Sequence, residues 1–142
     1  MNFDNHPLAN ATSWLFVPAS RPERIAKALA SGADAVIVDL EDAVAPADKD
    51  AAREALLGMM QTLAVPQRAR VLVRINAPGT QWFGSDVQAL GQLCQQGCAG
   101  VVLPKAEEAA ALAILADAVG DSGVVVPIIE SVWGLHCIDA IA

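Results

Sequence analysis

The sequence is poor in basic residues: it has 9 lysines and arginines against 16 aspartates and glutamates, for a net charge of -7. A general nucleic-acid partner requires a stripe of positive charge, which these scattered residues do not form. No apolar run reaches the roughly 18 uncharged residues of a membrane helix, and residues 1–12 lack the pattern of a signal peptide. We therefore expect a cytoplasmic protein that binds neither nucleic acid nor membrane.

Cysteine and histidine are also scarce. Cys94, Cys98 and Cys137 form no CxxC pair, and their odd number argues against a disulfide framework. His6 and His136 have neither the metal-ligand spacing of HExxH nor a paired serine motif. Neither a zinc site nor a disulfide-stabilised fold is therefore indicated.

Short aliphatic runs are abundant, since hydrophobic residues make up 54% of the 142 residues and aromatic residues only 4%. This length and composition allow one domain with a sizeable aliphatic core. We expect a flexible tail at 1–12 and a domain at 13–142. Strands are expected at 13–17, 35–40, 71–76, 100–103 and 124–129. Helices are expected from the turn at 18–22 to about residue 31, at 47–63, 86–96 and 107–119, and from 130 onward.

The alternation of strands and helices indicates successive βα units with parallel strands. A doubly wound sheet would usually carry a Gly-rich phosphate turn after the first strand, but residues 18–22, Pro-Ala-Ser-Arg-Pro, contain no glycine. A βα barrel instead places its chemistry at the carboxyl ends of several strands, where this sequence repeatedly has polar residues. We therefore expect an α/β fold of the TIM (βα)8-barrel type, with only about five βα units present.

Arg74 stands within an apolar run, Val-Leu-Val-Arg-Ile-Asn-Ala-Pro, at residues 71–78. A cation in a strand covered on both faces is costly unless it meets an anion or opens onto a polar cavity. Two interpretations stay open: the guanidinium serves a site, or it reaches the rim and pairs with a neighbouring carboxylate. We favour the site, because the neighbouring apolar runs also end in polar residues.

Polar residues at the strand ends can converge, because the carboxyl ends of parallel strands open on the same face. The candidates are Arg21, Asp39, Glu41, Asp42, Arg74, Asn76, Lys105 and Glu130. Asp42 can equally cap the next helix, and Lys105 can equally be a surface ion-pair partner. Glu130 directly follows an apolar strand, so it either binds a cation or substrate or pairs with a neighbour such as Lys105.

The chemistry of this residue set favours a hard cation. Several carboxylates without clustered histidine or thiolate suit Mg²⁺ better than Zn²⁺. A magnesium ion beside Arg74 would stabilise an enolate, with the ion on one oxygen and the guanidinium on the other charge. That is the chemistry of breaking a carbon–carbon bond next to a carbonyl.

Five segments then occur in order across nearly the whole chain: SWLFVPASRPER at 13–24, DLEDAV at 39–44, VRIN at 73–76, LPK at 103–105 and IIES at 128–131. In order and spacing they resemble the citrate lyase beta-subunit-like group of the HpcH/HpaI aldolase family. The resemblance implies a TIM barrel and an Mg²⁺-dependent lyase acting on a short 3-hydroxyacyl thioester, such as citryl, malyl or methylmalyl, on CoA or an acyl carrier. It also implies a homo-oligomer, often a trimer.

The same resemblance implies roles for individual residues. Arg74 would be catalytic and would bind the substrate's carboxylate and carbonyl, and Glu130 would be the first metal ligand. Glu41 and Asp42 would form a catalytic acidic pair bordering the metal and its waters, while Asp39 would support the scaffold. The second metal carboxylate of the family is expected beyond residue 142.

The substrate-binding set includes four further residues. Arg21 and Arg24 resemble the segment near the nucleotide end of CoA, while Asn76 and Lys105 are placed near the substrate. Two other functions stay open beside the thioester lyase. One is a pyruvate-type aldolase acting on free 2-oxo acids, and the other is a truncated, non-catalytic barrel kept as a binding or assembly partner.

Overall fold

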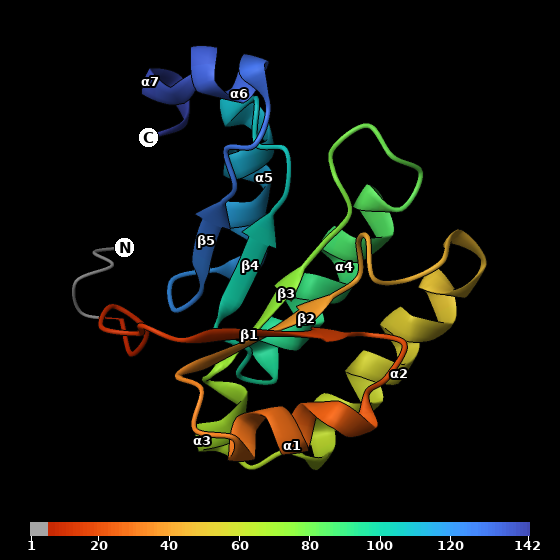
Figure 1. The fold of residues 1–142 in the computed structure, drawn as a ribbon. Helices are drawn as coiled ribbons and strands as arrows, with labels where there is room; N and C mark the ends of the chain where they lie inside the picture. Colours follow the sequence, from red (N-terminus) through yellow and green to blue (C-terminus); the bar gives the residue numbers. More distant parts are fainter. Residues whose placement is uncertain (1–5) are drawn as a thin grey trace.

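The computed structural model describes residues 6–142, whose strands form one parallel sheet (Figure 1). The strands are β1 (Trp14–Pro18), β2 (Ala35–Asp39), β3 (Val71–Arg74), β4 (Gly100–Leu103) and β5 (Val124–Pro127). They are hydrogen-bonded in chain order, and every neighbouring pair is parallel. The parallel βα arrangement predicted from the sequence is therefore confirmed.

Four longer helices connect these strands: α1 (Glu23–Ala30), α2 (Lys49–Thr62), α4 (Phe83–Gln95) and α5 (Ala109–Val119). Shorter elements are the 3-10 helix η2 (Pro46–Asp48) and the helices α3 (Val65–Arg68), α6 (Val132–His136) and α7 (Ile138–Ile141). The single helix predicted from residue 130 onward is wrong, because α6 and α7 are separated at Cys137. Among residues 6–142 we find no helix with the length and apolar character needed to span a membrane.

The helices cover one face of the sheet. Successive strand residues point to opposite faces. Val36, Val38, Val71 and Val73 belong to a core cluster that also contains buried residues of α1, α2, α4 and α5, among them Ile25, Leu56, Leu90 and Leu115. The cluster on the opposite face, formed by Leu8, Ala35, Ile37, Leu72, Ala99, Val102 and Val124, contains no residue of the described helices.

This one-sided layering bears on the choice between the two architectures. A doubly wound sheet carries helices on both faces and reverses its strand order, whereas a βα barrel has its helices outside and its strands in sequence. The observed order and layering are those of consecutive barrel units. The five described strands form an open sheet, so the closed barrel stays a prediction.

The segment before β1 contacts the domain where it is described. Residues 1–5 of the predicted tail lie outside the described residues. Leu8 is buried on the helix-free face, and Asp34 Oδ2 accepts hydrogen bonds from the amides and hydroxyls of Thr12 and Ser13. These bonds favour the charged form and hold the pKa of the Asp34 carboxyl well below its usual range.

Gly100 gives a test of the β4–β5 pairing. Its φ is 151°, and an added Cβ would lie 2.0 Å from the carbonyl oxygen of Val124, a backbone atom of the neighbouring strand. We expect Gly100→Ala to lower the free energy of unfolding, measured in urea, by about 3 kcal/mol. Gly91→Ala is the matched control: it lies within α4 with its nearest atom 3.8 Å away. Gly91→Ala should raise the free energy of unfolding by about 0.5 to 1 kcal/mol. Small changes of similar size in both variants would contradict the packing argument for Gly100.

Candidate functional site

A buried ion pair joins the carboxyl ends of β2 and β3. Arg74 and Asp39 are register partners, and both lie on the helix-free face of the sheet. Arg74 donates from Nε to Asp39 Oδ1 at 2.8 Å and from Nη2 to Oδ2 at 2.7 Å. Asp39 is 1% exposed, and its carboxylate also accepts the amides of Glu41 and Ala43. Burial would raise the pKa of Asp39, but the Arg74 guanidinium and the two amides outweigh it and lower that pKa.

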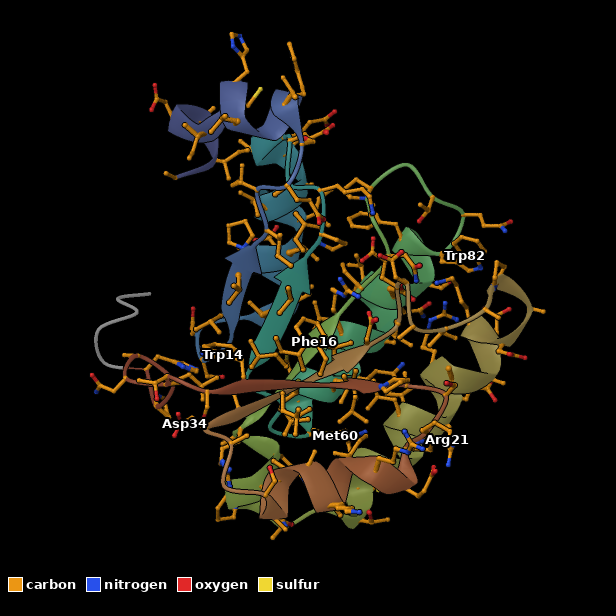
Figure 2. All side chains as sticks on the ribbon, in the orientation of Figure 1. Trp14, Phe16, Arg21, Asp34, Met60 and Trp82 are labelled. Carbon is orange, nitrogen blue, oxygen red and sulfur yellow. The ribbon has the colours of Figure 1, made fainter. Side chains whose placement is uncertain are left out.

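Arg74 keeps donors for a further partner. The guanidinium has five N–H groups, and three of its nitrogens contact the carboxylates of Asp39 and Glu41. The guanidinium carbon lies 5.0 Å from the centroid of the Phe16 ring, and Phe16 (labelled in Figure 2) is half exposed. The ion pair expected as the alternative interpretation of Arg74 is thus present, and it leaves three of the five N–H groups without a hydrogen bond.

Glu41 lies between two cations. Its Oε2 is 3.1 Å from Arg74 Nη1, and its Oε1 accepts a short hydrogen bond from Lys105 Nζ. Although Oε2 is buried and lies 3.1 Å from Arg74 Nη1, it has no hydrogen bond. A buried charged oxygen without a hydrogen bond is costly, and the nearby guanidinium offsets part of that cost.

Lys105 connects Glu41 to the end of β5. Its backbone N–H donates to Glu130 Oε1 at 2.9 Å, while its ammonium binds Glu41. Lys105 is the one non-glycine residue among those described with a positive φ, 48°. Nearby Glu41 raises the pKa of the Lys105 ammonium, which keeps it charged. Glu130 is exposed and contacts the backbone of Lys105 rather than its side chain.

The predicted residues are therefore brought together in part. Arg74, Glu41, Lys105 and Glu130 form a continuous series of contacts along the carboxyl edge of the sheet, although Arg74 and Glu130 do not touch. Asp42 is exposed beside them and makes no hydrogen bond or ion pair.

Other predicted residues lie apart from this series. Arg21 pairs with Glu23 and is about half exposed, and in Figure 2 it lies well away from Phe16. Arg24 is exposed on α1. Asn76 is buried, and its side chain is hydrogen-bonded to the Lys49 ammonium, the Asp86 carboxylate and the Leu40 carbonyl. The predicted strand at 71–76 ends at Arg74, since the amide of Asn76 donates to Asp86.

Sequence reasoning missed the buried polar group behind the site. Lys49 Nζ donates to Asn76 Oδ1 at 2.7 Å, and Asp86 accepts from Asn76 and from Arg53. A signal was present, because Lys49 and Arg53 are spaced four residues apart on the stripe that continues to the buried Leu56. Charged residues on the apolar side of a predicted helix require buried partners.

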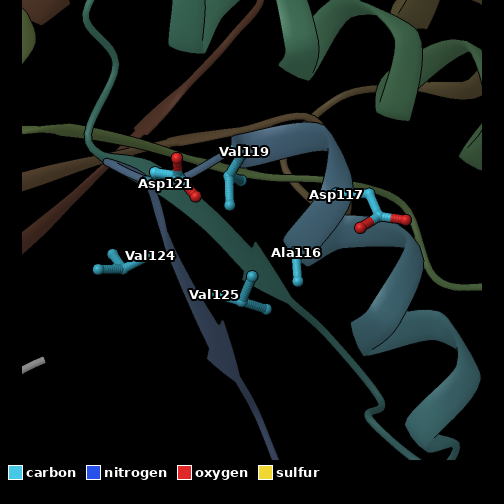
Figure 3. Close-up of a pocket in the computed structure, with 8 residues that line it drawn as sticks. Ala116, Asp117, Val119, Asp121, Val124 and Val125 are labelled. Atoms are coloured by element: carbon cyan, nitrogen blue, oxygen red, sulfur yellow. The ribbon is translucent and has the colours of Figure 1, made fainter. Parts of the chain in front are cut away.

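Two hollows border the site, and Lys105 lines both. One of about 360 Å³ is lined by Glu41, Asp42, Val44, Pro46, Lys49, Asn76, Ala77, Thr80, Trp82 and Lys105. The other, of about 380 Å³, is lined by Ala77, Pro78, Gly79, Lys105, Glu107 and Glu108. The larger hollow of Figure 3, about 700 Å³, lies between α5 and the beginning of β5 and has no cationic residue in its lining. It is at the opposite end of the strands from Arg74 and Glu130.

The described residues fit magnesium only as a partial set of ligands. Among residues 6–142 no group of three or more His, Cys, Asp or Glu side chains could hold a metal ion. Magnesium, however, usually keeps several waters and takes one or two carboxylates together with substrate oxygens. The exposed carboxylate of Glu130 meets that smaller requirement, whereas the Oε2 atom of Glu41 is buried against Arg74.

Comparison with known proteins shows the family of the chain. The model of the family HpcH/HpaI aldolase/citrate lyase matches residues 12–142. The chain belongs to this family. A citrate lyase subunit beta-like protein from Mycobacterium tuberculosis is 45% identical over 134 residues, covering 94% of this chain and 44% of the relative. A (3S)-malyl-CoA thioesterase from Cereibacter sphaeroides is 36% identical, covering 77% of this chain and 37% of the relative.

A solved structure is also similar to this chain. The protein CitE from M. tuberculosis, in complex with magnesium, acetoacetate and coenzyme A, matches with a TM-score of 0.73 and 44% identity, covering 92% of this chain and 44% of that one. The resemblance drawn from the five sequence segments is confirmed. The chain spans less than half the length of the two curated relatives named above.

Removing Arg74 tests the buried pair. Arg74→Met leaves the Asp39 carboxylate buried without its cation, so we expect a loss of about 3 kcal/mol in unfolding free energy at about pH 7. Because the folded pKa of Asp39 lies below its unfolded value of about 3.9, the pair stabilises the fold above that pH and less so below it. The difference between the two proteins in urea should therefore narrow as the pH falls toward about 3. Lys27→Met, which changes an exposed residue of α1, should leave the free energy of unfolding unchanged at every pH. A loss for Arg74→Met that does not depend on pH would contradict the assignment.

Two substitutions of Lys105 separate its charge from its backbone conformation. Both Lys105→Ala and Lys105→Gly remove the ammonium from Glu41, but only glycine adopts a φ of 48° without a steric penalty. The glycine variant should therefore be more stable than the alanine variant by about 1 kcal/mol in urea. The opposite order would show that the positive φ carries no strain.

Proposed function

We propose that this chain forms part of an Mg²⁺-dependent carbon–carbon lyase that cleaves a short 3-hydroxyacyl thioester, such as citryl or malyl, on CoA or an acyl carrier. The observation that carries the proposal is the series of contacts Arg74–Glu41–Lys105–Glu130 along one edge of the sheet. Family membership supports it, as does the relative solved with magnesium, acetoacetate and coenzyme A.

The proposal includes the architecture of the whole protein. We propose that these five strands are consecutive units of a closed (βα)8 barrel in a cytoplasmic homo-oligomer, with a trimer favoured. Helices on one face and strands in unbroken order support the barrel. An additional strand or a partner would pair with the backbone of β5, which is the last strand of the described sheet.

The chemistry required is a bond cleavage with a proton transfer. The hydroxyl loses its proton and becomes a carbonyl, the adjacent carbon–carbon bond breaks, and its electron pair moves into the thioester as an enolate. The enolate carbon then takes up one proton to give the acetyl thioester. Asp42, exposed at the site, would accept the hydroxyl proton, and Glu41 lies beside it in the same hollow. The unassigned N–H groups of Arg74 would hold a substrate carboxylate or carbonyl oxygen as negative charge develops.

Glu130 would hold the metal, with Glu41 bordering it, and the metal's contribution when bound is to polarise the substrate's carbonyl oxygen. Lys105 lines both hollows, so its ammonium would meet an anionic group entering from either side. Arg21 and Arg24 are exposed cations just beyond β1 and would meet the phosphates of a carrier or nucleotide. Asn76 would support the substrate site by fixing the loop after β3, where its amide and side chain are hydrogen-bonded.

Three other activities remain candidates. Thioester hydrolysis is favoured by the relative named (3S)-malyl-CoA thioesterase; in that reaction water attacks the thioester carbonyl and the carbon–sulfur bond breaks. A pyruvate-type aldolase would use free 2-oxo acids. A non-catalytic binding or assembly partner would retain the fold without turnover. The products formed from a thioester substrate and from a free hydroxy-oxo acid distinguish these possibilities.

The test compares Arg74→Ala and Glu130→Gln with the unmodified protein, using citryl-CoA and malyl-CoA with Mg²⁺ and chromatographic detection of products. Each substitution should lower turnover at least about 100-fold with the fold retained, because Arg74→Ala removes the cation that faces the developing enolate and Glu130→Gln removes the carboxylate that would hold the metal. Asp121→Asn, in the distant hollow of Figure 3, and Lys27→Met are the charge-matched controls and should keep full turnover.

The product pattern decides the reaction. A lyase gives acetyl-CoA and a 2-oxo acid, whereas a thioesterase gives free CoA and the hydroxy acid. Cleavage of a free hydroxy-oxo acid without any thioester would identify the aldolase. Near-normal turnover in both site variants would refute the assignment of Arg74 and Glu130.

A further inference from the structure

Lys49 is a buried cation whose ammonium is satisfied entirely by neutral oxygens. It is 4% exposed at the first position of α2, and its Nζ lies 2.7 Å from the carbonyl of Leu40, the carbonyl of Glu41 and Oδ1 of Asn76. Three acceptors need three N–H groups, which only the protonated amine has. The Trp82 ring covers the ammonium at 5.0 Å from its centroid.

This arrangement is costly and therefore requires an explanation. Burial lowers the pKa of the Lys49 ammonium, since water that would solvate the charge is excluded. Among the described residues no carboxylate lies within ion-pair distance of its Nζ. An apolar residue would fill the same position without this cost. What the ammonium adds is three hydrogen bonds, two to the loop after β2 and one to the loop after β3.

Those bonds fix the backbone that carries Glu41. The two carbonyls belong to Leu40 and Glu41, which follow β2 directly, so the ammonium anchors the turn from which the Glu41 carboxylate reaches Arg74 and Lys105. The third acceptor, Asn76, follows β3 and is itself held by Asp86. One side chain thus ties the loops after β2 and β3 together below the site.

We propose that Lys49 is a positioning residue that sets the place of the Glu41 carboxylate and does not itself contact the substrate. Lys49 lines the hollow beside Glu41, but its three N–H groups all bond protein oxygens, so none is left for a ligand. The inference rests on the proposed function insofar as Glu41 belongs to the metal and substrate site. It adds a residue outside the polar strand-end set, whose main effect on the site is through the Glu41 turn.

A double-mutant cycle tests this role in the full protein. Binding of Mg²⁺ with oxaloacetate is measured by calorimetry in the unmodified protein, Lys49→Met, Glu41→Gln and the double variant. Lys49→Met should weaken binding about tenfold when Glu41 is present and less than about twofold in the Glu41→Gln background, because the lysine acts through that carboxylate. A purely structural lysine would weaken binding by the same factor in both backgrounds, which would overturn the proposal.

Arg53→Met is the matched control. Arg53 is also buried and belongs to the same polar group, but it bonds Asp86 and Asp50 and not the Glu41 turn. It should lower the urea midpoint while changing binding less than about twofold. Circular dichroism reports folding of each variant, and Lys49→Arg, which keeps a cation, enters the same cycle if Lys49→Met is unfolded; the same non-additivity is expected.

The outcomes separate the two proposals. If Glu41→Gln leaves Mg²⁺ and oxaloacetate binding unchanged, Glu41 is not part of the site and the proposed function loses its support there. If Glu41→Gln weakens binding but Lys49→Met acts equally in both backgrounds, the site stands and only the positioning role of Lys49 is refuted.

Discussion

The ion pair between Arg74 and Asp39 is the interaction on which the arrangement of the site depends. Both residues point to the helix-free face at the last register position of β2 and β3, where each would be costly without the other. Because the pair uses only part of the guanidinium, Arg74 can also reach Glu41, and Glu41 in turn meets Lys105. The charge that the proposed chemistry requires is thus held in place by the carboxylate of Asp39.

The sheet separates two kinds of stabilisation. On the helix-covered face the strands contribute aliphatic side chains to a large core, whereas the opposite face becomes polar toward its carboxyl edge. Behind that edge Lys49, Asn76, Asp86 and Arg53 form a second, buried polar group. Such groups are stable only when their hydrogen bonds are satisfied, so they fix loop positions more strictly than apolar contacts do.

Family membership and the geometry of the strand ends both support the proposed thioester chemistry. The relatives are named as citrate lyase beta-like proteins and malyl-CoA thioesterases, which share a thioester context but differ in the bond that breaks. Within the described part of the chain, residues 6–142, no group of three or more His, Cys, Asp or Glu side chains could hold a metal ion, although magnesium takes few protein ligands. The choice between these reactions therefore depends on groups that complete the site, including the substrate.

The sequence by itself determined the βα order, the parallel sheet and the family, because aliphatic runs and strand-end motifs are local features of the chain. It also identified Arg74, Glu41, Lys105 and Glu130 as neighbours, since parallel strands open on one edge. Only the tertiary structure decided which charges pair, because a side chain's partner depends on register and loop path rather than on spacing in sequence. Lys49 shows the reason most clearly: its acceptors lie up to 27 residues away and two of them are backbone carbonyls, which no residue type reveals.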